Sequence, residues 1–279
     1  MHSSNFPPPR LSSVELDSLY QTLHSFTVFF IILVAMCCVA LLAVVIALIK
    51  ISLSKQHEKE SVEYASHIIT AQEEERSRLS AELHDTVAQD LCVALSISEN
   101  EKQREILRGS IEQIRSLCYT LVPPPLAKTQ LSSILRNLCL KFIEDTKIEA
   151  NFLIKKEAED LLNSQNFSTS QKLNVYRIVQ ESLLNVKKHA QASEVSIFAR
   201  CETKGENTGV YISIEDDGKG FSGKTAAQKV KKNHFGLQGM KQRALLLGGT
   251  LTINFKTSDS DMESGTEVIL FIPTGVFEK

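Results

Sequence analysis

A histidine and an aspartate are adjacent at His84 and Asp85, and Gln89 follows five residues after the histidine on the same predicted helix. An imidazole is nucleophilic near neutral pH, and a neighbouring carboxylate can hold or take one ring proton while the other nitrogen attacks phosphorus. A histidine on a charged helix is more often a solvated surface residue. The pair therefore indicates a phosphate acceptor only if the rest of the chain can supply a phosphoryl donor.

A second group of polar residues lies on a predicted helix over residues 169–189. Glu181 and Asn185 are four residues apart and Lys188 is three further on, so the three side chains can share one helix face. Carboxylate and amide oxygens suit a magnesium ion that keeps several waters, and an ammonium suits phosphates. A solvated helix face has the same composition, so this group also needs further support.

An aspartate and two glycines stand at the end of a predicted strand over residues 210–215. Gly218 and Gly220 let the backbone approach a ligand closely, and Asp216 can accept a hydrogen bond from an exocyclic amine such as that of adenine. An ordinary Asp-Gly turn between two elements gives the same pattern.

A third segment has glycines at the start of a predicted helix over residues 237–247. Free amide N–H groups at a helix start bind phosphates, and Gly236 and Gly239 would leave them accessible. A glycine-bearing helix start without a ligand is the alternative. Thr266 follows and is placed for a hydroxyl contact in the same pocket, which is a weaker signal.

The elements that must position these groups begin with a stretch of 24 residues without a charge, residues 26–49. At about 1.5 Å per residue, a helix of this length crosses a hydrocarbon core of about 30 Å. A buried helix or a signal peptide are the alternatives, but the stretch is too long for a signal peptide and no convincing cleavage site follows. Lys50, Lys55 and Lys59 follow closely, which predicts a single-pass protein of the cytoplasmic (inner) membrane with its C-terminal part in the cytoplasm.

Composition excludes several classes of function. The net charge is −2 and the charges are interspersed, so we expect no direct binding to nucleic acid. The six cysteines show neither a C-x-x-C pair nor a clustered histidine, which indicates neither a zinc site nor a disulfide framework. The leader before the span is short and serine- and proline-rich, so we expect no sensor domain on that side.

Two amphipathic helices are predicted after a polar helical stalk. The first carries leucines and a valine at four-residue intervals over residues 79–95, and the second covers residues 107–121, before the three prolines 123–125 end it. Such a hairpin exposes more apolar surface than it can bury alone, so we predict a homodimer in which two hairpins form a four-helix bundle. A short helix over residues 131–142 follows.

From about residue 147 the pattern is mixed α and β. Strands are predicted at 148–154, 194–200, 210–215, 250–255 and 266–272, with a polar loop over residues 222–233. This alternation predicts an α/β sandwich in which helices cover one face of a mixed sheet.

The order of the four motifs resembles a sensor histidine kinase of a two-component system, of the nitrate-sensor and degradative-enzyme-sensor type. Residues 75–91 resemble its H-box, 176–190 its N-box, 216–220 its first glycine box and 236–240 its second, in a GHKL-type ATPase domain. The resemblance covers roughly residues 70–273. It departs from the family at Ser80 and Ala81, where an Ala-Arg pair is usual, and in having no input domain.

The resemblance implies a role for each motif residue. His84 would be the phosphoacceptor, Asp85 its neighbouring base, and Gln89 would orient water when the phosphorylated partner is dephosphorylated. ATP would bind with Mg²⁺ on Asn185, assisted by Glu181, with Lys188 near the phosphates. The remaining ATP contacts would be Asp216 to adenine, Gly218, Gly220 and Thr266 in the pocket, and Gly236 and Gly239 at the phosphates, under a lid at 222–235.

The family thus implies a kinase that phosphorylates His84 from ATP and passes the phosphoryl group to an aspartate of a cytoplasmic response regulator. Two alternatives stay open: a protein that mainly dephosphorylates its regulator, and a membrane-anchored scaffold with a vestigial ATP site. The predicted organisation is a leader at 1–25, a transmembrane helix at 26–49, a stalk at 50–75, a dimerisation and phosphotransfer domain at 76–142 and an ATP-binding domain at 143–279.

Overall fold

The computed structural model describes residues 13–204, 207–220, 235–256 and 264–277. Their contacts divide the chain into two compact units, Met1–Glu60 and Ser61–Lys279. Helix α1 (Ser13–Glu82) contributes to both units.

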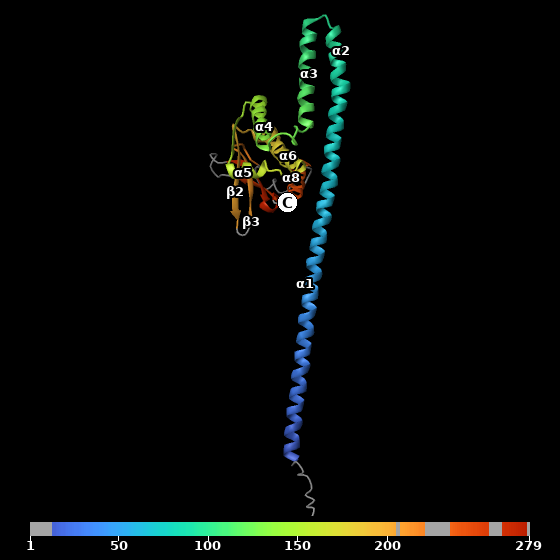
Figure 1. Cartoon of the computed structure of the whole chain (residues 1–279), viewed down its shortest axis with the longest axis vertical. Coiled ribbons are helices and arrows are strands. Elements are labelled where there is room, and N and C mark those ends of the chain that lie inside the picture. Colours follow the sequence, from blue (N-terminus) through green and yellow to red (C-terminus); the bar gives the residue numbers. More distant parts are fainter. Residues whose placement is uncertain (1–12, 205–206, 221–234, 257–263, 278–279) are drawn as a thin grey trace, which may run out of the picture. The chain divides into compact units, whose positions relative to one another are not determined.

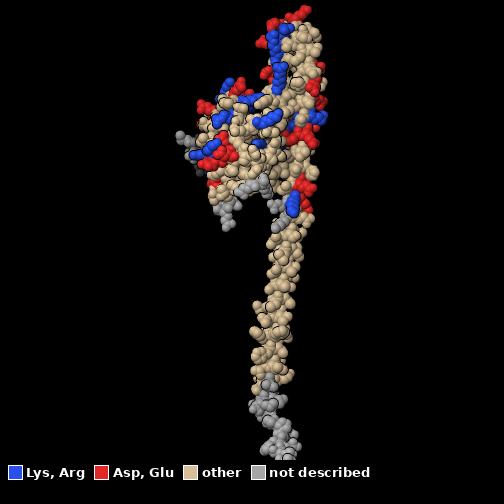
Figure 2. Space-filling view, viewed as in Figure 1, with Lys and Arg blue, Asp and Glu red and all other residues tan. Residues whose placement is uncertain are grey.

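The first unit consists of the N-terminal part of α1. Among the described residues, α1 holds the one stretch that is long and apolar enough to cross a membrane, and its most apolar 18-residue window has a mean hydropathy of 3.3 with none of it buried. Figure 2 shows this stretch without acidic or basic side chains. Length and composition alone support the predicted span at 26–49.

The second unit begins with a helical hairpin. A π-helical turn, η1 (Leu83–Ala88), interrupts the predicted first helix and separates α1 from α2 (Gln89–Ile97). The β-branched Thr86 and Val87 lie in this turn, where their restricted side chains weaken the α-helical preference. The return helix α3 (Glu101–Leu121) starts at Asn100, whose side chain accepts a hydrogen bond from the Gln103 N–H.

Helices α4 (Leu131–Thr146), α5 (Lys156–Leu162), α6 (Thr169–Asn185) and α8 (Phe235–Leu246) belong to the α/β part of the unit. A second π turn, η2 (Val186–Ala190), extends α6. Helix α4 confirms the predicted short helix, whereas α5 was not predicted. Ser168 and Gln171 form a capping box at the start of α6, which satisfies two otherwise unpaired N–H groups.

Five strands form one mixed sheet in the order β1-β2-β3-β5-β4. Among the described strands, the β1–β2 pair is parallel and the other three pairs are antiparallel. The five predicted strands are thus confirmed, with bounds β1 Glu149–Ile154, β2 Glu194–Lys204, β3 Asn207–Asp216, β4 Thr250–Lys256 and β5 Gly265–Pro273, followed by the 3₁₀ turn η3 (Thr274–Val276).

Helices α4, α6 and α8 lie over one face of this sheet (Figure 1). Their apolar faces and the inward side chains of the strands form one hydrophobic core, in which Leu135, Ile178 and Leu270 are fully buried. The predicted α/β sandwich is confirmed, and its core positions the ends of α6, β3 and α8, where the predicted site residues lie.

Candidate functional site

Asp216 is the last residue of β3 and is 7% exposed. It is paired in register with Thr266 of β5, so two predicted site residues that are fifty positions apart in the chain are neighbours in the sheet. Its Oδ1 accepts the backbone N–H of Gly218 at 3.0 Å. Burial raises the pKa of Asp216, although the backbone N–H groups of Gly218 and Thr266 oppose the shift. A buried carboxylate at a strand end is a specific acceptor for an amine.

The glycines after Asp216 are required by their surroundings. A Cβ on Gly218 would lie 2.5 Å from the carbonyl oxygen of Ala190, and Gly220 has φ of +59°, which glycine adopts without strain. The N–H of Lys219 donates to the same Ala190 oxygen at 2.9 Å. The loop after β3 is therefore held against η2, at the end of the helix that carries Glu181 and Asn185.

Asp217 holds this junction together from the other side. Its Oδ1 accepts the backbone N–H groups of Ser193 and Glu194, each at 2.9 Å, and its Oδ2 accepts the Ser193 hydroxyl. Burial opposes ionisation, but these hydrogen bonds outweigh it and lower the pKa of Asp217. Asp217 fixes the start of β2 beside the Asp216 loop, a positioning role that the sequence did not indicate.

Glu181 and Gly236 come together although 55 residues separate them in the chain. Glu181 is half-buried on α6, and a Cβ on Gly236 would lie 2.1 Å from its Oε1, so the carboxylate rests against the first turn of α8. Asn185 is the last residue of α6, one turn after Glu181, and is half-buried. Lys188 is exposed and lies on the π turn η2. The predicted position of Lys188 on the face of Glu181 and Asn185 assumed regular α-helical spacing, which the π turn interrupts.

The donor set of Glu181 and Asn185 suits magnesium. One carboxylate and one amide oxygen, both reachable by solvent, fit an ion that takes its other ligands from water and phosphates. Among the described residues there is no cluster of three or more His, Cys, Asp or Glu side chains that could form an all-protein cage. The predicted lid at 222–235 lies outside the described residues except for Phe235.

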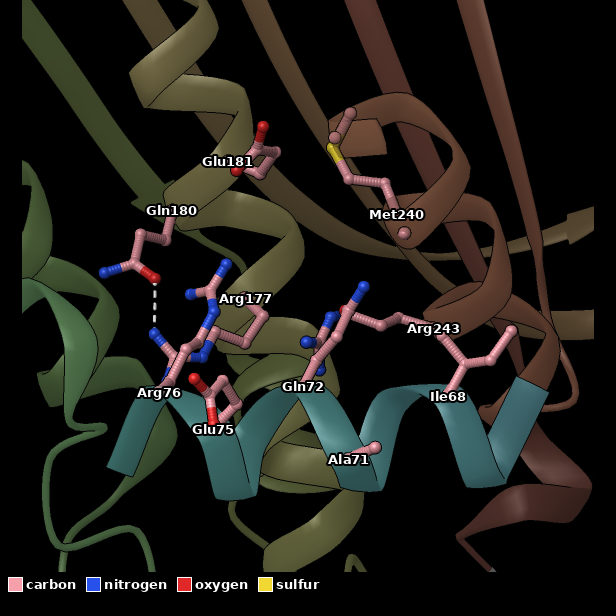
Figure 3. A pocket seen from close by; sticks show the side chains of 12 residues that line it. Ile68, Ala71, Gln72, Glu75, Arg76, Arg177, Gln180, Glu181, Met240 and Arg243 are labelled. Carbon is pink, nitrogen blue, oxygen red and sulfur yellow. Dashed lines mark hydrogen bonds between the residues drawn. The ribbon is translucent and has the colours of Figure 1, made fainter. Parts of the chain in front are cut away.

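A cavity of about 610 Å³ lies in front of Glu181, between the helices of the α/β part and α1 (Figure 3). Gly239 and Met240 of α8 also line it, and its opposite wall is α1 around Gln72 and Arg76. The complete lining is Ile68, Ala71, Gln72, Glu75, Arg76, Arg177, Gln180, Glu181, Gly236, Gly239, Met240 and Arg243.

The predicted phosphoacceptor is exposed to solvent. The His84 side chain is 68% exposed, and its Nδ1 lies 3.0 Å from Oδ1 of Asp85. A carboxylate at Nδ1 favours the tautomer that carries its proton there and leaves the lone pair on Nε2 for nucleophilic attack. His84 is not among the residues that line the cavity beside Glu181.

The π turn η1 changes the relation between His84 and Gln89. In an α-helix, residues five apart point roughly 140° away from each other. Backbone bonds of a π turn join residues five apart, which brings such residues toward one face. Both side chains are exposed on η1 and the first position of α2.

Three charged residues that the sequence analysis missed form a buried ion cluster. Glu73 of α1 accepts hydrogen bonds from Arg177 of α6 at 2.7 Å and from Arg243 of α8 at 2.6 Å. The two arginine side chains are 2% and 5% exposed. Burial alone would raise the pKa of Glu73, but the two guanidinium groups outweigh it and lower that pKa. The one available signal was Arg177 itself, a charge between Tyr176 and Ile178 on an apolar helix.

Comparison with known proteins gives two results. The model of the histidine kinase-, DNA gyrase B-, and HSP90-like ATPase family matches residues 170–276. The chain is 30% identical over 232 residues to the signal transduction histidine-protein kinase/phosphatase DegS of Brevibacillus brevis, covering 77% of this chain and 55% of that protein.

Two further relatives are the sensor histidine kinase MctS of Rhizobium johnstonii and the oxygen sensor histidine kinase NreB of Staphylococcus carnosus. MctS is 29% identical over 225 residues, covering 74% of this chain and 44% of that protein, and NreB is 32% identical over 219 residues, covering 74% and 58%. The chain thus spans about half the length of these relatives. The family that the motifs indicate is confirmed: residues 170–276 belong to the histidine kinase-, DNA gyrase B-, and HSP90-like ATPases, and the chain's relatives are sensor histidine kinases of the nitrate-sensor and degradative-enzyme-sensor subfamily.

Proposed function

We propose that this chain is a membrane-anchored sensor histidine kinase that phosphorylates His84 from ATP and passes the phosphoryl group to an aspartate of a cytoplasmic response regulator. One observation carries the proposal. Within a domain of an ATPase family, Asp216 is paired with Thr266 and Glu181 lies against Gly236, and the same chain also presents the His84–Asp85 pair.

In the proposed reaction, Nε2 of His84 attacks the γ-phosphorus, an N–P bond forms, and the bond to the bridging oxygen breaks as ADP leaves. The positive charge that develops on the imidazole is stabilised by Asp85 at Nδ1, 3.0 Å away. Magnesium held at Asn185, with Glu181 assisting, would neutralise phosphate charge. Catalysis by positioning and charge neutralisation is what phosphoryl transfer requires.

The test uses the full chain in lipid vesicles with γ-labelled ATP. We expect label that is lost in acid and stable in base, and its absence from His84→Ala. The matched control is His67→Ala, since His67, on α1, is likewise an exposed histidine. Label that persists in His84→Ala would overturn the assignment of the phosphoacceptor. If the chain binds no adenine nucleotide by calorimetry, a scaffold with a vestigial site becomes the better proposal.

A second activity, dephosphorylation of the regulator, is favoured by the π turn, which brings Gln89 toward the face of His84. Gln89 would orient the attacking water. Gln89→Ala should slow loss of phosphate from the regulator about tenfold or more while autophosphorylation persists. Gln113→Ala, an exposed glutamine of α3, is the control. Equal dephosphorylation by the two variants would remove this role from Gln89.

The membrane anchor and the homodimer are part of the same proposal. The apolar stretch of α1 supports a single span, and Lys50, Lys55 and Lys59 after it support a cytoplasmic C-terminal part. Cysteine-reactive probes that cannot cross the membrane should leave residues after the span unlabelled in sealed cells. Labelling of Cys92, which is exposed on α2, would reverse the proposed orientation.

A further inference from the structure

The cavity beside Glu181 faces a part of α1 that lies before the phosphoacceptor. Its wall on α1 runs from Ile68 to Arg76, and His84 is eight residues beyond Arg76. At 1.5 Å per residue, eight residues correspond to about 12 Å along the helix. In this arrangement Glu181 and Gly236 face α1 before the histidine rather than the histidine itself.

The buried ion cluster holds this arrangement. Glu73 lies within the cavity's span on α1, and it accepts hydrogen bonds from one arginine of α6 and one of α8. Arg177 also donates from Nη2 to the carbonyl oxygen of Leu121 at 2.7 Å and from Nη1 to that of Thr120 at 3.2 Å. The cluster therefore joins α1, the last turn of α3 and the two helices of the ATPase domain.

The charges of the cluster are unbalanced without Glu73. Arg177 and Arg243 converge on one carboxylate, and Arg76 adds a third guanidinium to the cavity wall. Loss of the carboxylate would leave buried positive charges facing each other, which is strongly unfavourable. Water can replace these contacts when the helices separate, because the interface beside them is an open cavity that several charged and amide side chains line, rather than a packed core.

We propose that Glu73, Arg177 and Arg243 form an ionic latch that holds the ATPase domain against α1 before His84, and that release of this latch lets the bound nucleotide reach the histidine. The inference rests on the proposed function for the reaction itself. A rotation of α1 about its axis would carry Glu73 away from both guanidinium groups, so a turn of this helix is sufficient to open the latch.

The test compares Glu73→Gln with Glu74→Gln in the full chain in lipid vesicles. Glutamine keeps the shape of the side chain and removes its charge, and Glu74 is an exposed neighbour on the same helix. Glu73→Gln should raise the initial rate of His84 phosphorylation at saturating ATP by threefold or more, with unchanged affinity for an ATP analogue. Glu74→Gln should match the unchanged chain.

A second readout reports on docking instead of activity. Amide hydrogen exchange over residues 68–76 and 236–243, on the two walls of the cavity, should be faster in Glu73→Gln than in Glu74→Gln. Equal exchange in the two variants, or a Glu73→Gln rate equal to or below that of Glu74→Gln, would overturn the latch.

A third measurement needs no variant and covers the case in which Glu73→Gln fails to fold. Salt screens the charges that become exposed to solvent when the latch opens, and so it favours the open state. The rate of the unchanged chain at saturating ATP should therefore rise between about 50 and about 300 mM salt, over which the Debye length falls from above about 10 Å to below it. A flat or falling rate would count against the latch. If no chain is labelled at His84, it is the proposed function that fails, so the two failures are distinct.

Discussion

The ATPase domain and the helical hairpin differ in how much of their apolar surface one chain can cover. Helix α6 buries eight of its residues, whereas α2 buries none and α3 buries only Ile111. Val93 and Ile97 of α2 and Leu117 of α3 are more than half exposed. The ATPase domain covers its apolar core within one chain, whereas the hairpin that carries the proposed phosphoacceptor leaves apolar side chains exposed, which supports the proposed homodimer.

The largest effect should come from removing a side chain in the completed core. Ile178 of α6 is fully buried in the hydrophobic core of this domain. Ile178→Ala leaves a cavity and should lower the free energy of unfolding of the ATPase domain by about 2–5 kcal/mol. Chemical denaturation measures this change. Ile97→Ala, on the exposed face of α2, is the matched control, and an equal loss there would contradict the difference between the two regions.

A charge on the exposed hairpin face should have the next largest effect, and it should act on assembly. Val93→Glu would place a carboxylate in the proposed four-helix bundle, where burying an unpaired charge weakens the dimer by at least about tenfold in dissociation constant. Sedimentation measures this shift. The ATPase domain should keep its affinity for nucleotide. A dimer of unchanged strength would remove this face from the interface.

The N-terminal caps of one helix in each region should have smaller effects on stability. Ser168 caps α6 in the domain and Asn100 caps α3 in the hairpin, and each side chain accepts the N–H of a glutamine three residues on. Replacement by alanine typically costs about 1 kcal/mol. Ser168→Ala should lower the melting temperature of the ATPase domain, and Asn100→Ala should affect the dimer. Scanning calorimetry would separate the two transitions, and a reversed pattern would contradict the assignment.

The smallest effect on stability is expected at Asp216, and it depends on pH. Because burial raises its folded pKa above the unfolded value, the domain gains stability from this group below the unfolded pKa and loses it as the pH rises through the folded pKa. Asp216→Asn should therefore leave the melting temperature at pH 7 within about 4 °C of the unchanged chain, or raise it. Adenine nucleotide binding should be lost, because one carboxylate oxygen becomes an amide NH₂ group, which donates a hydrogen bond where the adenine amine needs an acceptor. A large fall in melting temperature would show that Asp216 serves the fold instead.

Much of the domain could be predicted because apolar and polar residues alternate along the strands of its sheet. Every second residue of strand β4 is partly buried, and the predicted strand agrees with β4 within one residue at its end. The ends of α6, β3 and α8 then bring the glycines and Asp216 to one region, which motif order already indicated. Helix α5 was missed because seven residues are too few to show a helical period.

The ion cluster and the two π turns could not be predicted for a different reason. Arg177 and Arg243 lie 104 and 170 positions from Glu73, and no local pattern marks a partner at such a separation. A π turn differs from an α-helix in its backbone hydrogen bonds, and the periodicity of apolar side chains along the sequence does not reveal this difference. Both features depend on which helices meet, so they follow from packing and not from local sequence.

The continuity of α1 up to Glu82 makes the length of this helix a constraint on the chain. Glu73 and His84 are eleven positions apart, so the number of residues between them fixes the distance and rotation from the proposed latch to the proposed phosphoacceptor along the helix, up to the π turn that begins at Leu83. A one-residue insertion between Arg78 and Glu82 would turn the histidine by about 100° relative to the latch and shift it by about 1.5 Å. This stretch should accept many substitutions at its exposed positions. Insertions and deletions there should disturb the regulation of phosphorylation, although the residues proposed for the reaction itself stay in place.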